Sequence, residues 1–102
     1  MMTVYNIEAD SRNIKQNLSR IGNQIYKALC LREEEKEWQK PLETLCVELL
    51  GMHTLFPEEL NLFSLVCKMQ GILSDDQMSF MQYRRTIFEC CSLVNKIKDN
   101  ID

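Results

Sequence analysis

The sequence has little glycine and proline, with three Gly and two Pro among 102 residues. These two residues are common in turns, so their scarcity argues against a loop-rich or all-β chain. No apolar run approaches the ~18–20 residues that span a bilayer, and the first residues do not show the basic and apolar segments of a secretory signal. We therefore expect a single cytoplasmic domain over residues 1–102, without membrane contact.

The chain also lacks a basic excess and the spacings of a metal site. Its formal net charge is −3 at pH 7, whereas proteins that bind nucleic acid through phosphates usually carry a positive excess. The single histidine, His53, has no second ligand three or four residues away, and no two cysteines show CxxC spacing. We interpret the cysteines as reduced thiols and expect no metal and no cofactor. They are Cys30, Cys46, Cys67, Cys90 and Cys91.

The clearest pattern that is present is a stripe of mostly apolar residues three or four positions apart. Its members are Val4, Ile7, Ser11, Ile14, Leu18, Ile21, Ile25 and Ala28. The spacing predicts a long helix over residues 3–31 with a narrow seam that fits a partner helix. We expect the seam from Leu18 to Ala28 to cover the rest of this chain. Its first part, Val4 to Ile14, should project past the other helices toward another chain.

Three further helices are predicted, over about 41–51, 57–71 and 74–98. Prolines stand at the start of the first two and glycines at their ends, as is typical of helix boundaries. More than half of residues 42–73 are Leu, Ile, Val, Phe, Met or Cys, so we expect the two middle helices to form a buried hairpin. The predicted fold class is all-α: a four-helix bundle-like domain with long N- and C-terminal helices around a short apolar helical hairpin.

The last helix is expected to begin with a capping box at Ser74-Asp75-Asp76-Gln77. On this helix Cys91 should face the core and Cys90 its flank, because adjacent helical residues diverge by about 100°. Its predicted apolar face comprises Met78, Met81, Phe88, Cys91, Val94 and Ile101, with Phe80, Ile87 and Ile97 beside it.

Residues 32–40 form a charge run that contains Trp38, the only tryptophan. The run either extends the first helix or forms an exposed connection. Two interpretations of Trp38 stay open at this point. It folds back onto the edge of the core, or it is an exposed aromatic anchor for a partner.

Catalytic patterns are incomplete in this sequence. Glu34 and Glu37 form an ExxE motif that resembles half of the magnesium site of all-α nucleotide pyrophosphatases, but the second acidic motif is missing. Cys90 and Cys91 carry no local signature that would pair them with His53 as a nucleophile and base. We therefore predict that the protein is not an enzyme and has no small-molecule substrate.

A non-enzymatic helical protein-interaction module, such as an adaptor, inhibitor or small subunit, is the function that these patterns favour. It would bind a protein partner or itself, as a homodimer or small oligomer, through helix-in-groove contacts. Chains of this build are common among viral and phage accessory proteins, which is an association of architecture only. The predicted contact residues are Val4, Ile7, Ile14, Leu18, Ile21, Ile25, Trp38, Tyr83, Arg84 and Arg85.

The alternative is a DNA-binding regulator that uses a helix-turn-helix-like unit at about residues 58–98. Tyr83, Arg84 and Arg85 would supply a small basic-aromatic cluster. Against it, the second helix of that unit would start with Asp75 and Asp76, where phosphates approach. Nucleic acid is therefore the less favoured partner.

Overall fold

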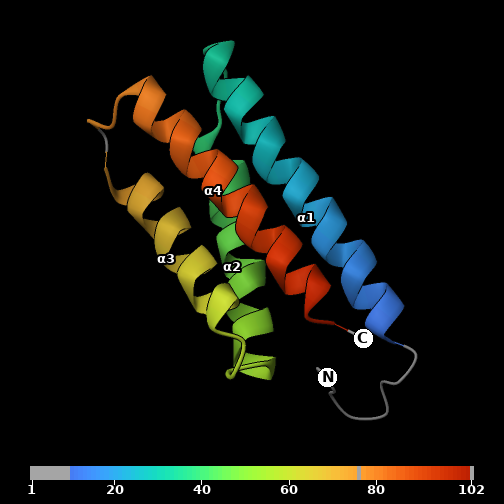
Figure 1. The fold of residues 1–102 in the computed structure, drawn as a ribbon. Coiled ribbons are helices and arrows are strands. Elements are labelled where there is room, and N and C mark those ends of the chain that lie inside the picture. The colour runs from blue at the N-terminus through green and yellow to red at the C-terminus, as the bar shows by residue number, and fades with distance from the viewer. Residues whose placement is uncertain (1–9, 76, 102) are drawn as a thin grey trace.

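The structure is a computed structural model that describes residues 10–75 and 77–101, and it confirms the all-α fold class. Its helices are α1 (Asp10–Glu33), α2 (Gln39–Leu55), α3 (Leu60–Ser74) and α4 (Phe80–Asp99). Each helix packs against its two neighbours in a ring, as the pairs α1–α2, α2–α3, α3–α4 and α4–α1. The result is an elongated bundle of 43 × 20 × 20 Å in which α4 lies between α1 and α3, with α2 behind (Figure 1).

The seam of α1 forms one wall of the core, as the sequence predicts. Leu18, Ile21, Ile25 and Ala28 each have 0% exposure, and they meet apolar residues of all three other helices in one cluster. The α1–α4 pair approaches closely at Gly22, where an added Cβ would lie 3.4 Å from Val94 Cγ1. The stripe from Leu18 to Ala28 therefore serves intramolecular packing.

The charge run is divided between the end of α1 and an exposed connection. α1 ends at Glu33. Two backbone hydrogen bonds follow: Glu35 N donates to Arg32 O (3.0 Å), and Lys36 N donates to Leu31 O (2.8 Å). These are the two bonds of a Schellman motif, which places Glu35 in the left-handed position with φ of 60°. Glycine is the residue that adopts this conformation without a Cβ clash.

We predict that Glu35→Gly raises the free energy of unfolding by about 0.5–1 kcal/mol, because it relieves the left-handed strain at this helix end. Urea denaturation followed by circular dichroism measures the change. The matched control is Glu33→Gly, two residues earlier and still inside α1, which should lower stability by a similar amount. Equal destabilisation by both substitutions would contradict this prediction.

The predicted start of the last helix is wrong by several residues. Ser74 is the final residue of α3, and α4 begins at Phe80 with Ser79 as its N-cap, whose Oγ accepts from Gln82 N at 3.2 Å. The sequence holds two consecutive S-x-x-Q patterns, and the second one caps the helix. In the first, Asp75 instead accepts from Gln77 N, in a turn between the helices.

The predicted apolar face of the last helix is also partly wrong. Met81 is 82% exposed and Phe88 is 44% exposed, whereas Cys90 is fully buried and Cys91 lies at the flank. The buried face of α4 follows a spacing of three or four residues that begins at Tyr83. Its buried members are Tyr83, Ile87, Cys90, Leu93, Val94 and Ile97.

The prediction that the two middle helices form a buried hairpin is also partly wrong, since each of them is buried on one side only. α2 and α3 each turn one side to the core and leave the opposite side exposed, because both occupy corners of the ring. Gly51 and Gly71 do not end their helices, which continue to Leu55 and Ser74. Across the described residues, no helix combines the length and the apolar character needed to cross a membrane.

Candidate protein-interaction surface

The predicted contact residues of the first helix do not form a free surface. Leu18, Ile21 and Ile25 are enclosed in the core and are unavailable to a partner in this structure. Ile14 is half-buried and packs against the same core. Val4 and Ile7 lie outside the described residues.

Trp38 and Tyr83 meet at one end of the bundle, where they close the core. Their rings make an edge contact with centroids 4.8 Å apart, and Tyr83 Oη donates a hydrogen bond to the Ala28 carbonyl at 3.0 Å. Of the two interpretations of Trp38, the structure shows the one in which it folds back onto the core. Burial of Tyr83 raises the pKa of its phenol well above the usual value.

Arg32 completes this end cluster, and the sequence did not single it out. Its guanidinium lies 4.4 Å from the ring centroid of Tyr83 and 5.2 Å from that of Trp38, and Nη2 donates to the Met78 carbonyl at 2.7 Å. One side chain thus joins α1, the α1–α2 connection, α4 and the α3–α4 connection. The available signal was an arginine in the last turn of a helix, six residues before the only tryptophan.

The predicted Tyr83-Arg84-Arg85 cluster is divided between core and surface. Tyr83 points inward, whereas Arg84 and Arg85 are exposed. The Arg84 guanidinium lies 5.1 Å from the ring of Phe88, and Arg85 lines a shallow hollow beside Met81. The three residues therefore do not present one basic-aromatic surface.

The geometry of α3 and α4 does not favour the helix-turn-helix alternative. That motif joins two helices at roughly 90–120°, with the second free to enter a groove. Here α3 and α4 run alongside each other as bundle neighbours (Figure 1). Lys68 and Glu89 join them with an ion pair of 3.1 Å.

The acidic residues of the ExxE motif have structural roles in the α1–α2 connection. Glu37 accepts hydrogen bonds from Gln39 N (2.8 Å) and Lys40 N (3.1 Å), which satisfies free N–H groups at the start of α2. Glu34 pairs with Lys36 at 3.4 Å. Among the described residues, no group of three His, Cys, Asp or Glu side chains could hold a metal ion.

The cysteines differ sharply in exposure. Cys67 is exposed on α3, whereas Cys90 is enclosed in the core, where burial, assisted by the neighbouring Cys91 thiol, raises the pKa of its thiol to about 12. Burial also raises the pKa of the Cys46 and Cys91 thiols. Because the thiolate is the reactive form, the core cysteines should be inert in the folded protein.

We predict that dilute folded protein treated briefly with N-ethylmaleimide at pH 7 is alkylated first at Cys67 and last at Cys90. The rate ratio should exceed about 100-fold, because reaction at Cys90 requires the core to open. Peptide mass spectrometry measures the modification at each site, and the same protein in urea is the control. Comparable rates at both sites in the folded protein would show that this core is open.

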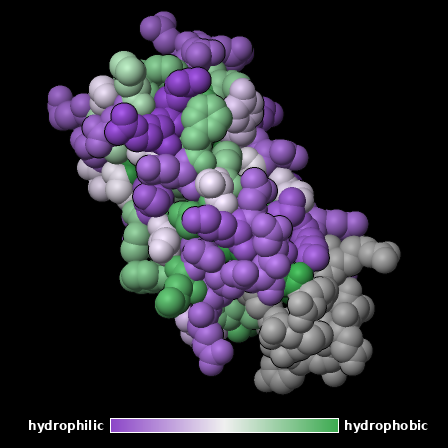
Figure 2. Space-filling model, viewed as in Figure 1, coloured by the Kyte–Doolittle hydropathy of each residue, from purple (hydrophilic) through white to green (hydrophobic). Residues whose placement is uncertain are grey.

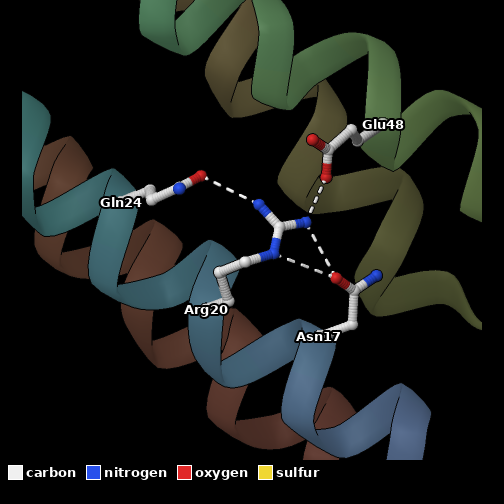
Figure 3. Close-up of polar contacts among 4 residues, drawn as sticks. All are labelled: Asn17, Arg20, Gln24 and Glu48. Atoms are coloured by element: carbon white, nitrogen blue, oxygen red, sulfur yellow. Dashed lines mark hydrogen bonds and ion pairs between the residues drawn. The ribbon is translucent and has the colours of Figure 1, made fainter.

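A polar network joins α1 to α2 on one side of the bundle (Figure 3). The Arg20 guanidinium donates to Asn17 Oδ1, to Gln24 Oε1 at 3.0 Å and to Glu48 Oε2 at 2.6 Å. Because Arg20 and Glu48 remain substantially exposed, this ion pair contributes at most about 1 kcal/mol. The ion pair directs the Glu48 carboxylate toward α1 (Figure 3).

Along its two helices the outer side of the α2–α3 hairpin lacks charge, whereas the connection between them carries the exposed Glu58. We call this surface the outer hairpin face. Every exposed residue of α3 is uncharged, and so is every exposed residue of α2 from Thr44 onward. The charged residues in these stretches, Glu48 and Lys68, are held in ion pairs with α1 and α4. The exposed members of the face are Val47, Leu50, Gly51, Leu60, Phe63, Ser64, Cys67, Gln70 and Gly71.

Large apolar side chains are concentrated on this face. Leu60 is 74% exposed, Val47 68% and Phe63 55%. In Figure 2, in which α4 faces the reader, hydrophobic residues appear along the side of the molecule occupied by α3. Sequence reasoning missed the face because it assigned all apolar residues of 42–73 to the core. The signal was present, since α3 has more apolar positions than one helix face can bury.

No protein-family model, curated protein or solved structure matches this chain, so its function is inferred from the residues and geometry described above.

Proposed function

We propose that this protein is a non-enzymatic helical protein-interaction module that binds through the outer hairpin face. The single observation that carries the proposal is that α3 exposes Leu60 and Phe63 and no charged residue. A solvent-facing helix normally carries charged residues on its outer side. Large exposed apolar patches mark surfaces that another molecule covers, and protein partners are among the commonest.

The other conspicuous residues have structural roles, which supports an interaction function over a catalytic one. Glu37 satisfies backbone groups at the start of α2, Arg32 and Tyr83 close the end of the bundle, and Cys90 packs in the core. The aromatic and aliphatic residues of the face are the types that anchor helix-mediated contacts.

The test compares three full-length baits, the wild type, Phe63→Glu and Met81→Glu, in affinity capture from cells that express the chain. Met81 is an equally apolar and more exposed residue on α4, so its substitution controls for added surface charge. We expect a protein that is retained by the wild type and by Met81→Glu but lost with Phe63→Glu.

Titration calorimetry with the purified captured protein should then show at least a tenfold loss of affinity for Phe63→Glu alone. Unchanged binding by Phe63→Glu would overturn the assignment of this face. Circular dichroism of each bait confirms that the fold is intact.

A further inference from the structure

Exposed residues on α3 change in size along the helix, and this gradient identifies an occupant for the outer hairpin face. The N-terminal half of α3 exposes the large residues Leu60 and Phe63. The C-terminal half exposes the small residues Gly71 and Ser74 together with the longer Gln70, and Cys67 lies at the midpoint of the helix. A helix that is bulky at one end and small at the other is complementary to an antiparallel copy of itself.

We propose that a second copy of this chain covers the outer hairpin face, with α3 antiparallel to α3 of the partner about a two-fold axis near Cys67. This inference rests on the proposed interaction function and names its partner. In this register the residue numbers of any two facing residues add up to 134. Phe63 of one copy therefore lies over Gly71 of the other. Leu60 lies over Ser74 in the same way, and the two Cys67 side chains lie across the axis.

Gly71 supplies an independent argument for close approach at this face. A glycine inside an exposed helix is unfavourable relative to alanine, and one use of glycine is to allow close approach of another group to the backbone. An added Cβ at Gly71 would meet nothing within 4 Å in this chain. No packing inside the bundle therefore explains the glycine, whereas the ring of Phe63 from a second copy would occupy the space above it.

Charge also favours a second copy over a charged partner. In an isologous contact the groups near the two-fold axis meet their equivalents, so a charge near Cys67 would be brought near a like charge. The exposed residues of α3 contain none, and Lys68 is engaged with Glu89 on the α4 side. A strongly charged partner would find no ion-pair partner among the exposed residues of α3 and would bury its own charges at a cost.

The area of the face fits a dimer that dissociates on dilution. The exposed parts of Val47, Leu50, Leu60 and Phe63 amount to roughly 400 Å² per chain, which lies within the range of functional patches on monomers. With its polar rim, a symmetric contact would fall near the lower end of specific interfaces, at about 1,200 Å² in total. We therefore expect a dissociation constant in the micromolar range, roughly 1–100 μM.

Sedimentation equilibrium of the full chain from 1 to about 300 μM tests the proposal, since that range brackets the expected constant. The wild type and Met81→Glu should change from monomer to dimer over this range. Phe63→Glu should stay monomeric with an unchanged circular dichroism spectrum. Gly71→Leu, whose Cβ would meet nothing within 4 Å inside the chain, should occupy the space above Gly71 and weaken the dimer at least tenfold.

Cross-linking tests the register. A short bismaleimide should convert the wild type to a covalent dimer at 100 μM, and both Cys67→Ser and Phe63→Glu should abolish the product. A wild type that is monomeric throughout the range, or a dimer that persists in Phe63→Glu, would overturn the proposal. A dimer that is not cross-linked at Cys67 would overturn the antiparallel α3 register. The wild type could also be monomeric and still capture another protein in a Phe63-dependent manner. That result would overturn the proposed dimer but support the proposed interaction function.

Discussion

Leu18→Glu is expected to abolish cooperative folding. Leu18 is fully enclosed between α1 and the other helices, and the described residues include no buried charged or polar residue that could pair with a carboxylate there. A buried, unpaired charge is unfavourable by several kcal/mol, and the lost apolar contacts add about 2–3 kcal/mol. Together these approach the whole stability of a typical domain, about 5–15 kcal/mol.

Circular dichroism with urea titration gives the measurement for Leu18→Glu, which should have a weakened helical signal and no unfolding transition. Gln16→Glu makes a similar change at an exposed position of the same helix and should stay within about 0.5 kcal/mol of the wild type. Leu18→Ala should remain folded but lose about 2–5 kcal/mol. A folded Leu18→Glu protein that merely changes its oligomeric state would show that the seam lies between chains.

The α1 seam shows why much of the fold could be predicted from sequence. Leu18, Ile21, Ile25 and Ala28 follow the helical period strictly, and most of the positions between them are polar. Such a pattern determines both the helix and the side that is buried. The start of the third helix was predicted less accurately, since Pro57 was expected to begin it, whereas α3 begins at Leu60 with Glu59 as its N-cap.

The boundaries and faces of the later helices were harder to predict, for identifiable reasons. Two S-x-x-Q patterns begin five residues apart, and both satisfy the local chemistry of a helix start. Tyr83 was grouped with its basic neighbours, although its ring belongs to the apolar face. Its role depends on contacts with Trp38 and Ala28, which are distant in sequence, so no local pattern could reveal it.

The candidate surface was hidden by an excess of apolar residues. In α3, apolar side chains occupy the core side and also the exposed positions Leu60 and Phe63, and hydropathy alone does not separate the two sets. The separation follows from the ring arrangement, which gives each helix two neighbours and leaves one side uncovered. Charge would have been the better guide, since the absence of charged residues from the uncovered side is visible in the sequence.

Substitutions at Tyr83 should have the second-largest effects, and they separate the ring from its hydroxyl. Tyr83→Ala is expected to lower the free energy of unfolding by about 3–5 kcal/mol, because it removes a fully buried ring that contacts Trp38 and Arg32. Tyr83→Phe keeps the ring but leaves the Ala28 carbonyl without this donor, so it should lose only about 1–2 kcal/mol.

Trp38 reports directly on this cluster because it is the only tryptophan. Its fluorescence should shift to longer wavelength in Tyr83→Ala, where the ring loses its edge contact, and stay nearly unchanged in Tyr83→Phe. Urea denaturation monitored at Trp38 and by circular dichroism should give the same transition for each variant, since the cluster belongs to the shared core. A Tyr83→Ala protein with wild-type stability would contradict the assigned role.

Alkaline pH provides an independent check of the hydroxyl. Burial raises the Tyr83 pKa in the folded protein above its ordinary value of 10.0, so the folded state retains a proton that the unfolded state releases. The associated stability is therefore fully present below pH 10 and is lost as the pH rises from that value toward the folded-state pKa. Between pH 9 and 11 the wild type should lose more stability than Tyr83→Phe, which has no phenol to ionise at this position. Parallel losses in the two proteins would show that Tyr83 does not hold its proton through burial in the bundle.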